Sequence, residues 1–253
     1  MPPSLERPTL QIFPTALASG AWNMARDEAM LLRAVEVDQP CLRFYSWAEP
    51  TLTLGYFQQH TERRSHPRLG ELAWVRRATG GGAIVHDPAC EITYALALPA
   101  NLGTAPTAAN WICQMHYLIR DALAELGASV RAVVCGEEQK LDPFLCFSHH
   151  TPGDLACSGV KVAGSAQRKQ RGAILQHGSL TLRGSPLTPM LPGLAELTGI
   201  SVHLGPLADA LQRQITHQLG WHIRDATWTD AMDQSAQQIH AGTYATVAWN
   251  EKR

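Results

Sequence analysis

Three consecutive glycines, Gly80 to Gly82, separate two short runs of residues that favour β-structure. The runs are residues 74–79 and residues 83–86, and together they predict two strands joined by a glycine connection. Glycine adopts positive φ values without strain and lets a ligand approach the backbone closely. The connection is neither a P-loop nor a dinucleotide-binding fingerprint, because Gly-Lys-Ser/Thr, the GxGxxG spacing and a following helix are absent. Taken alone, the three glycines are consistent with a ligand site of another kind or with a simple turn between strands.

Four segments of the chain predict helices. Residues 107–126 carry apolar side chains at helical spacing, and Gly127 stands where such a helix should end. Residues 23–37 contain helix formers and a partial apolar stripe, with neither glycine nor proline. Residues 207–219 and 229–239 are also expected to be helical.

Runs of β-favouring residues occur between these helices. We expect residues 41–47 and 51–57 to form a hairpin or adjacent strands around a turn at Glu49 and Pro50. Further strands are expected within residues 91–98, 130–134 and 155–182. Meandering strands with interspersed helices, rather than strict alternation of the two, predict an α+β domain with a largely antiparallel or mixed sheet.

The composition excludes several classes of protein. With 253 residues and 45% hydrophobic content, the chain can bury a core, and we expect one domain over residues 1–253, in which residues 183–253 form a helical C-terminal part. The 21 basic and 22 acidic residues give a formal net charge of -1, which argues against nucleic acid as a partner. The first residues do not resemble a secretory signal and no apolar run reaches membrane-spanning length, so we expect a cytoplasmic protein without a membrane partner.

Six cysteines are spread along the chain without a CxxC pair or a compact Cys/His set. This spacing argues against a disulfide framework and against a zinc site, so no metal is expected. The role of a small buried apolar side chain is expected for five of the six, namely Cys41, Cys90, Cys113, Cys135 and Cys157.

The glycine connection belongs to a longer motif. Residues 76–87 read Arg-Arg-Ala-Thr-Gly-Gly-Gly-Ala-Ile-Val-His-Asp, which closely resembles the RRxTGGGAVxHD signature of the lipoate/octanoate protein ligase-transferase family. Residues 23–29, 42–58 and 91–94 are also similar to family segments, so the resemblance covers about residues 20–182. It implies the catalytic-domain fold of the biotin/lipoate protein ligase superfamily, a mixed and mostly antiparallel sheet flanked by helices. In that family the glycine segment walls an acyl-chain pocket.

A second block resembles the same family. Residues 159–168 and 175–180 are similar to its GxKIxGSAQxR and LQHGS pattern, whose lysine contacts the reactive acyl carbonyl or acyl phosphate. Lys161 occupies this position, where an ammonium group in a partly dry pocket would stabilise developing negative charge. The resemblance implies a substrate-binding set composed of Arg76, Arg77, Gly80, Gly81, Gly82, His86, Tyr94, Gly164, Ser165, Ala166, Gln167, His177 and Gly178.

Cys146 distinguishes between subclasses of this family. One class of octanoyltransferases carries a nucleophilic cysteine in a Cys-Phe segment, and here Cys146 precedes Lys161 by fifteen residues, the spacing typical of that class. A thiolate close to an ammonium group is a competent nucleophile toward a thioester. Where the family tends to have Pro-Ser and then Tyr-Glu, this chain has Ser-His-His-Thr-Pro-Gly-Asp. Either His149 or His150 is a possible base, although adjacent loop histidines are more often solvated.

The resemblance implies an octanoyltransferase that needs no cofactor. Cys146 would take an octanoyl group from a thioester on acyl carrier protein or a glycine cleavage H-type protein, and a lysine of a 2-oxoacid dehydrogenase lipoyl domain or of H protein would accept it. One alternative is an ATP- and Mg²⁺-dependent lipoate-protein ligase acting through lipoyl-AMP. Another is a noncatalytic acyl- or carrier-binding protein. A biotin ligase is disfavoured, because its GRGRxG-type segment does not stand at Gly80.

Overall fold

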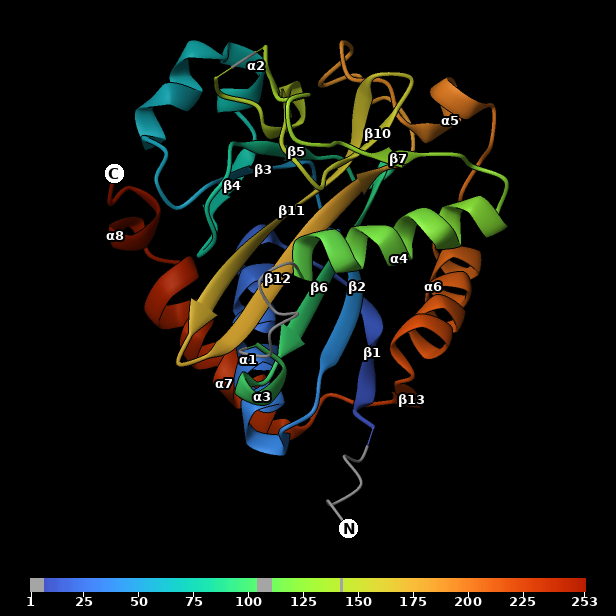
Figure 1. Cartoon of the computed structure of the whole chain (residues 1–253). Helices are drawn as coiled ribbons and strands as arrows, with labels where there is room; N and C mark the ends of the chain where they lie inside the picture. The colour runs from blue at the N-terminus through green and yellow to red at the C-terminus, as the bar shows by residue number, and fades with distance from the viewer. Residues whose placement is uncertain (1–6, 104–110, 142) are drawn as a thin grey trace.

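The computed structural model describes residues 7–103, 111–141 and 143–253, which fold around an eight-stranded sheet (Figure 1). Along the sheet the strands follow the order β13, β1, β2, β6, β12, β11, β10 and β7. Only β1 makes parallel pairs, with β13 and with β2, and every other pairing in this sheet is antiparallel. The expected α+β fold with a mixed, mostly antiparallel sheet is therefore confirmed. The strands are β1 (Thr9–Ala18), β2 (Cys41–Trp47), β6 (Glu91–Leu98), β7 (Arg131–Ala132), β10 (Leu155–Cys157), β11 (Val160–Gln170), β12 (Ala173–Thr181) and β13 (His222–Asp225).

Helices cover both faces of this sheet. Figure 1 shows α4 (Trp111–Glu125) in front of the strands, with α1 (Gly20–Val37) and α7 (Asp230–Ile239) behind them. The helix α6 (Leu204–Leu219) packs beside α4 in the same apolar layer. Strand β6 serves both layers by alternation, since its bulky apolar residues join the α4 layer and its alanines join the α1 layer. The shorter helices are α2 (Pro67–Gly70), α3 (Ala100–Gly103), α5 (Leu194–Thr198), α8 (Val247–Asn250), η1 (His60–Ser65), η3 (Cys146–Ser148) and η4 (His240–Tyr244).

A second, smaller sheet overturns the expected pairing of residues 41–47 with 51–57. Strand β3 (Thr51–Leu54) lies between β4 (Ala73–Arg76) and β5 (Ile84–His86), and does not pair with β2. The physical reason is burial, because Leu52 and Leu54 are fully buried in a separate apolar cluster with Leu69, Phe144 and Leu145. The turn at Glu49 and Pro50 therefore carries the chain from one sheet to the other. A third pairing joins β8 (Gln139–Lys140) to β9 (His149–His150).

The other predicted elements agree with the structure except at their ends. The first helix begins at Gly20, and the helix at 229–239 is confirmed, with the Thr229 hydroxyl capping it through the Met232 amide. Residues 107–110 of the predicted long helix lie outside the described residues. Strands β1, β8, β9 and β13 were not predicted, and β13 adds a strand to the C-terminal part that was expected to be helical. Among the residues described, none of the helices is long and apolar enough to span a membrane.

Candidate active site

Arg77 shapes the glycine connection between β4 and β5. Its guanidinium donates to the Thr53 carbonyl and hydroxyl, and to the carbonyls of Gly80 and Gly82, at 2.6 to 3.1 Å. The connection therefore curls around a buried cation. Gly81 has a φ of 90°, which favours glycine. Burial lowers the pKa of Arg77 to about 10, while the charge of Cys146 acts in the opposite direction, so Arg77 stays cationic at neutral pH.

The segment that carries Cys146 is hydrogen-bonded directly to the glycine connection. The Ala83 amide donates to the Phe144 carbonyl and the Cys146 amide donates to the Ala83 carbonyl, both at 2.8 Å. A Cβ atom on Gly82 would lie 3.0 Å from the Cys146 amide nitrogen, so the two backbones pack with little room for a side chain. Because of this pairing, two segments far apart in the sequence form a single unit. The glycine motif and the Cys-Phe motif are therefore neighbours in the structure.

Lys161 reaches the same unit from β11. Its Nζ lies 3.7 Å from Cys146 Sγ and 2.7 Å from Asp154 Oδ2, and the side chains of Lys161 and Asp154 are both buried. The Asp154 carboxylate also accepts hydrogen bonds from the amide and hydroxyl of Thr151. A buried ammonium needs such a partner, because a charge without one is costly to bury. An ammonium group at this distance can donate to a thiolate and stabilise its negative charge.

Gly164 provides the space for this ammonium group. A Cβ atom at position 164 would lie 2.5 Å from Lys161 Cε and 2.8 Å from Nζ. Any side chain there would therefore displace Lys161. The glycine in the family-like Gly-Ser-Ala-Gln block has a clear physical role, which is to let the lysine side chain lie against the backbone.

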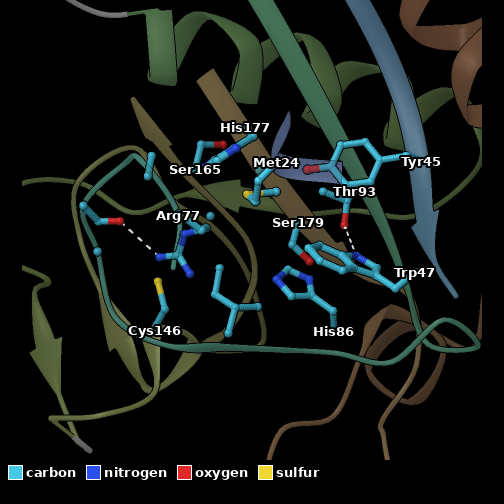
Figure 2. Close-up of a pocket in the computed structure, with 16 residues that line it drawn as sticks. Met24, Tyr45, Trp47, Arg77, His86, Thr93, Cys146, Ser165, His177 and Ser179 are labelled. Atoms are coloured by element: carbon cyan, nitrogen blue, oxygen red, sulfur yellow. Dashed lines mark hydrogen bonds between the residues drawn. The ribbon is translucent and has the colours of Figure 1, made fainter. Parts of the chain in front are cut away.

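A pocket opens beside Cys146 and runs between the large and small sheets. It encloses about 430 Å³, its open mouth included, and its surface is mostly apolar. In Figure 2 the Cys146 and Arg77 side chains lie at one end, and Trp47, His86 and Tyr45 lie toward the other. The residues that line the pocket are Met24, Tyr45, Trp47, Arg77, Gly80, Gly81, Ile84, His86, Thr93, Cys146, Gly164, Ser165, Ala166, His177, Gly178 and Ser179.

Several residues in the wall of this pocket are polar, but their polar atoms are hydrogen-bonded to one another and so do not face the pocket. Glu91 is the centre of this group, and its carboxylate accepts hydrogen bonds from His86 Nδ1, the Thr93 hydroxyl and the Ser179 hydroxyl. Trp47 Nε1 in turn donates to Thr93, and the Trp47 and His86 rings stack with centroids 3.9 Å apart. Burial lowers the pKa of His86, with Glu91 acting in the opposite direction. These hydrogen-bond donors are thus satisfied within the group, and the atoms that face the pocket are mostly carbon.

His177 ties the glycine connection to α1. One ring nitrogen lies 2.6 Å from the Thr79 hydroxyl, and the other lies 3.1 Å from Asp27 Oδ2. Asp27 also binds Arg43 and the Tyr45 hydroxyl. Burial alone would raise the pKa of Asp27, but the charges of Arg43 and His177 outweigh it and lower that pKa. This network fixes the part of the pocket wall to which Tyr45 and His177 belong.

Ten of the residues predicted from sequence line the pocket, and five do not. Arg76 is fully buried, and its guanidinium donates to backbone carbonyls that include those of Asn250 and Gln58, so it does not reach the pocket. Lys161 lies against Cys146 and Gly164, which line the pocket, but does not line it itself. Of the remaining three, Gly82 packs against Cys146 and Tyr94 binds Ser165, two residues that line the pocket, whereas Gln167 binds Gln176, which does not. The lining members are Arg77, Gly80, Gly81, His86, Cys146, Gly164, Ser165, Ala166, His177 and Gly178.

Other thiols and the two loop histidines are less suited to chemistry at this site. Burial raises the pKa of Cys41 to about 12 and that of Cys90 to about 11, which suppresses their thiolates. His149 and His150 form β9 and are not among the residues that line the pocket. Within the residues described, no group of three or more His, Cys, Asp or Glu side chains is arranged to hold a metal ion.

Sequence reasoning missed two kinds of residue. Asp154 was not predicted, although a carboxylate in the loop that leads to a reactive lysine is a usable signal. The second kind is a row across the sheet in which Tyr45 pairs with Thr93 and Thr93 with Ser179, so that the three side chains share one face. Period-two alternation along each strand was the available signal for that row.

Comparisons with known proteins add a family relationship. The sequence model of the lipoyl protein ligase A/B catalytic domain matches residues 19–218. An octanoyltransferase LipM of Moorella thermoacetica is 31% identical, with 97% of this chain and 98% of that protein aligned. The LipM of Brevibacillus brevis is 29% identical, with 94% and 97% aligned.

Solved structures share the fold at lower identity. A Thermoplasma acidophilum protein determined with bound lipoic acid superposes with a TM-score of 0.77 and 21% identity, over 97% of this chain and 99% of that chain. A lipoate-protein ligase A bound with ATP gives a TM-score of 0.73 and 21% identity, over 98% of this chain and 99% of that chain.

Proposed function

Because the chain belongs to the lipoyl protein ligase A/B catalytic domain family, we propose that Cys146 carries the acyl group during octanoyl transfer. The octanoyltransferase relatives, aligned over nearly their whole length, make the chain an acyltransferase of lipoate assembly. The observation that supports Cys146 as nucleophile is its sulfur, 3.7 Å from Lys161 Nζ and at one end of an apolar pocket. The pocket accepts the octanoyl chain, and its mostly carbon surface suits an unbranched alkyl group.

The first step is acylation of the enzyme. The Cys146 thiolate attacks the carbonyl carbon of an octanoyl thioester, a bond forms between that carbon and Sγ, and the bond to the carrier's sulfur breaks. The carrier leaves as a thiolate and takes up a proton. The Lys161 ammonium stabilises the negative charge that develops in this step, and Asp154 holds the ammonium in place. Acyl carrier protein or a glycine cleavage H-type protein is the donor in this proposal.

The second step transfers the octanoyl group to the acceptor. The uncharged ε-amine of a lysine on a lipoyl domain or on H protein attacks the acyl-enzyme carbonyl. A carbon–nitrogen bond forms, the bond to Sγ breaks, and the proton that the nitrogen loses as the amide forms passes to solvent. Cys146 returns as the thiolate beside Lys161, ready for another donor. Neither step consumes ATP, and no cofactor enters the proposal.

The fold alone does not separate this reaction from ATP-dependent ligation, since a ligase bound with ATP has the same fold. The transferase is favoured because of the sequence relatives, which are octanoyltransferases, and because a thiol stands beside the reactive lysine. A ligase acting through an adenylate has no use for that thiol.

Intact-mass measurement tests the proposal. The protein is mixed with an octanoyl-carrier thioester, with and without ATP, in the absence of an acceptor. We expect a mass increase of one octanoyl group without ATP, labile to hydroxylamine, because a thioester intermediate must wait for an acceptor amine. Cys146→Ala should give no adduct, whereas Cys157→Ala, which changes a buried thiol outside the pocket, should give it. An adduct that persists in Cys146→Ala, or that requires free acid and ATP, overturns the proposal.

A further inference from the structure

Helix α4 places one histidine in the apolar layer between itself and the sheet. His116 is fully buried, and both of its ring nitrogens are engaged. Nδ1 lies 2.5 Å from the Gly153 carbonyl oxygen, and Nε2 lies 2.6 Å from Ser165 Oγ. Figure 1 shows α4 crossing the strands that carry the site. A fully buried histidine is a polar group removed from water, so its two hydrogen bonds are needed to offset the loss of hydration.

The protons in this group can be placed from the chemistry of its members. A carbonyl oxygen only accepts, so Nδ1 of His116 must carry the proton and donate to Gly153. Burial lowers the pKa of His116, against the bond to Gly153, so the ring is neutral at pH 7 and Nε2 accepts from the Ser165 hydroxyl. Tyr94 then donates to Ser165 Oγ, and Gln176 donates to the Tyr94 hydroxyl. In this series of four hydrogen bonds, each donor therefore points along the path that ends at the Gly153 carbonyl.

Each of the two groups that His116 binds is the sequence neighbour of a residue that lies against the Lys161 ammonium. Gly153 immediately precedes Asp154, whose carboxylate lies 2.7 Å from Lys161 Nζ. Ser165 immediately follows Gly164, the glycine that leaves room for the same Nζ. The Gly153 and Asp154 backbones are held together against Val133, since the Gly153 amide donates to the Val133 carbonyl and the Val133 amide donates to the Asp154 carbonyl. A displacement of Gly153 would therefore be passed to Asp154.

We propose that His116 is a positioning residue for the acyl transfer, in which its Nδ1–H holds the Gly153 carbonyl and thereby fixes Asp154 and the Lys161 ammonium opposite Cys146 Sγ. This inference rests on the proposed function, since Cys146 and Lys161 are taken as the reacting pair. Among the described residues His116 does not line the pocket and has no contact with Cys146, although its Nε2 accepts from Ser165, which does line the pocket. Its effect on Asp154 and Lys161 is exerted through the backbone of Gly153.

Two substitutions distinguish positioning from simple filling of the core. The asparagine of His116→Asn can place an N–H where Nδ1 stands, whereas the glutamine of His116→Gln places its amide where Nε2 stands. We expect His116→Asn to keep the acylation rate of Cys146 within a few-fold of the original. His116→Gln should lower that rate at saturating octanoyl donor by on the order of tenfold to 100-fold, the cost of a misplacement of about 1 Å. The half-saturating donor concentration should not change, because the glutamine amide keeps the contact with Ser165 that His116 Nε2 makes at the pocket wall.

Alkylation of Cys146 by iodoacetamide gives a readout that does not depend on acyl transfer. The rate follows the thiolate, and Cys135, which is exposed, serves as an internal reference in the same peptide map. We expect His116→Gln to slow alkylation of Cys146 relative to Cys135 and His116→Asn to preserve it. Equal rates in the two variants, in either assay, overturn the positioning role. If alkylation follows the expected pattern but no acyl-enzyme forms in the unaltered protein, the positioning role holds and the proposed function fails.

Discussion

The sharpest test of the site geometry is a single added methyl group. Gly164→Ala would place a Cβ atom 2.5 Å from Lys161 Cε and 2.8 Å from Nζ. Carbon atoms in contact prefer separations of about 3.5 to 4.0 Å, so the end of the lysine side chain must move by roughly 1 Å. Lys161 is flexible, and the φ of Gly164 does not fall in the left-handed region, so the fold can absorb the change. The ammonium group, however, cannot keep its place between Asp154 and Cys146.

The expected loss follows from that displacement. A misplacement of about 1 Å at a reacting group costs on the order of 100-fold in rate, or about 2.7 kcal/mol in the activation free energy at 1.36 kcal/mol per factor of ten. The assay is the rate of acyl-enzyme formation on Cys146 at saturating octanoyl thioester, with thermal unfolding measured in parallel. Gly205→Ala in α6 is the matched control, since a Cβ there meets no atom within 4 Å. Full acylation activity in Gly164→Ala would falsify the assignment of Lys161 to the transition state.

Three further predictions follow from charges and backbone angles of the site. Lys161→Ala should lower the free energy of unfolding by about 3 kcal/mol in a denaturant titration, because Asp154 stays buried without its cation. The double change Lys161→Met with Asp154→Asn should recover most of that stability without recovering acylation, and recovery of acylation would exclude an electrostatic role for the lysine. Gly81→Val and Gly136→Val should both lose stability, since both glycines have positive φ, but only Gly81→Val should lose acyl transfer in a turnover assay. Burial lowers the pKa of His86 from 6.5 in the folded protein, so as pH falls the unfolded chain binds a proton before the folded chain does. The unfolding temperature should therefore decline as pH falls below about 6.5. An unfolding temperature that does not change with pH in this range would contradict a buried neutral His86 ring.

Local chemistry in the sequence predicted the site better than it predicted the strand partners. The fifteen-residue spacing of Cys146 and Lys161 indicated one site, and the structure brings Sγ and Nζ within 3.7 Å, although their catalytic role stays a prediction. The paired arginines show a limit of motif reasoning. Arg76 and Arg77 are adjacent where β4 ends, so their side chains point in opposite directions, one to the C-terminal segment and one to the pocket.

Long-range packing accounts for the remaining misses. Residues 51–54 are buried at every position, and only the tertiary cluster with Phe144 and Leu145 decides which sheet they join. Strand β1 contains Pro14 at a register shift, which weakens its sequence signal. The four residues of β13 are mostly exposed and pair only with β1, so hydrophobic periodicity could not reveal them. The cytoplasmic location, the single domain and the absence of a cofactor stay predictions.

The hydrogen bonds that converge on Glu91 bear on how long an acyl-enzyme survives. A thioester held for a partner protein is exposed to hydrolysis for as long as it waits, and water reaches a carbonyl most readily along unsatisfied polar groups. Because His86, Thr93 and Ser179 all donate to Glu91, this wall has few free donors with which to anchor a water molecule beside the acyl chain. Glu91→Ala would release those donors toward the pocket. We expect the acyl-enzyme of such a variant to have a shorter half-life in buffer, with loss of the octanoyl group as free octanoate.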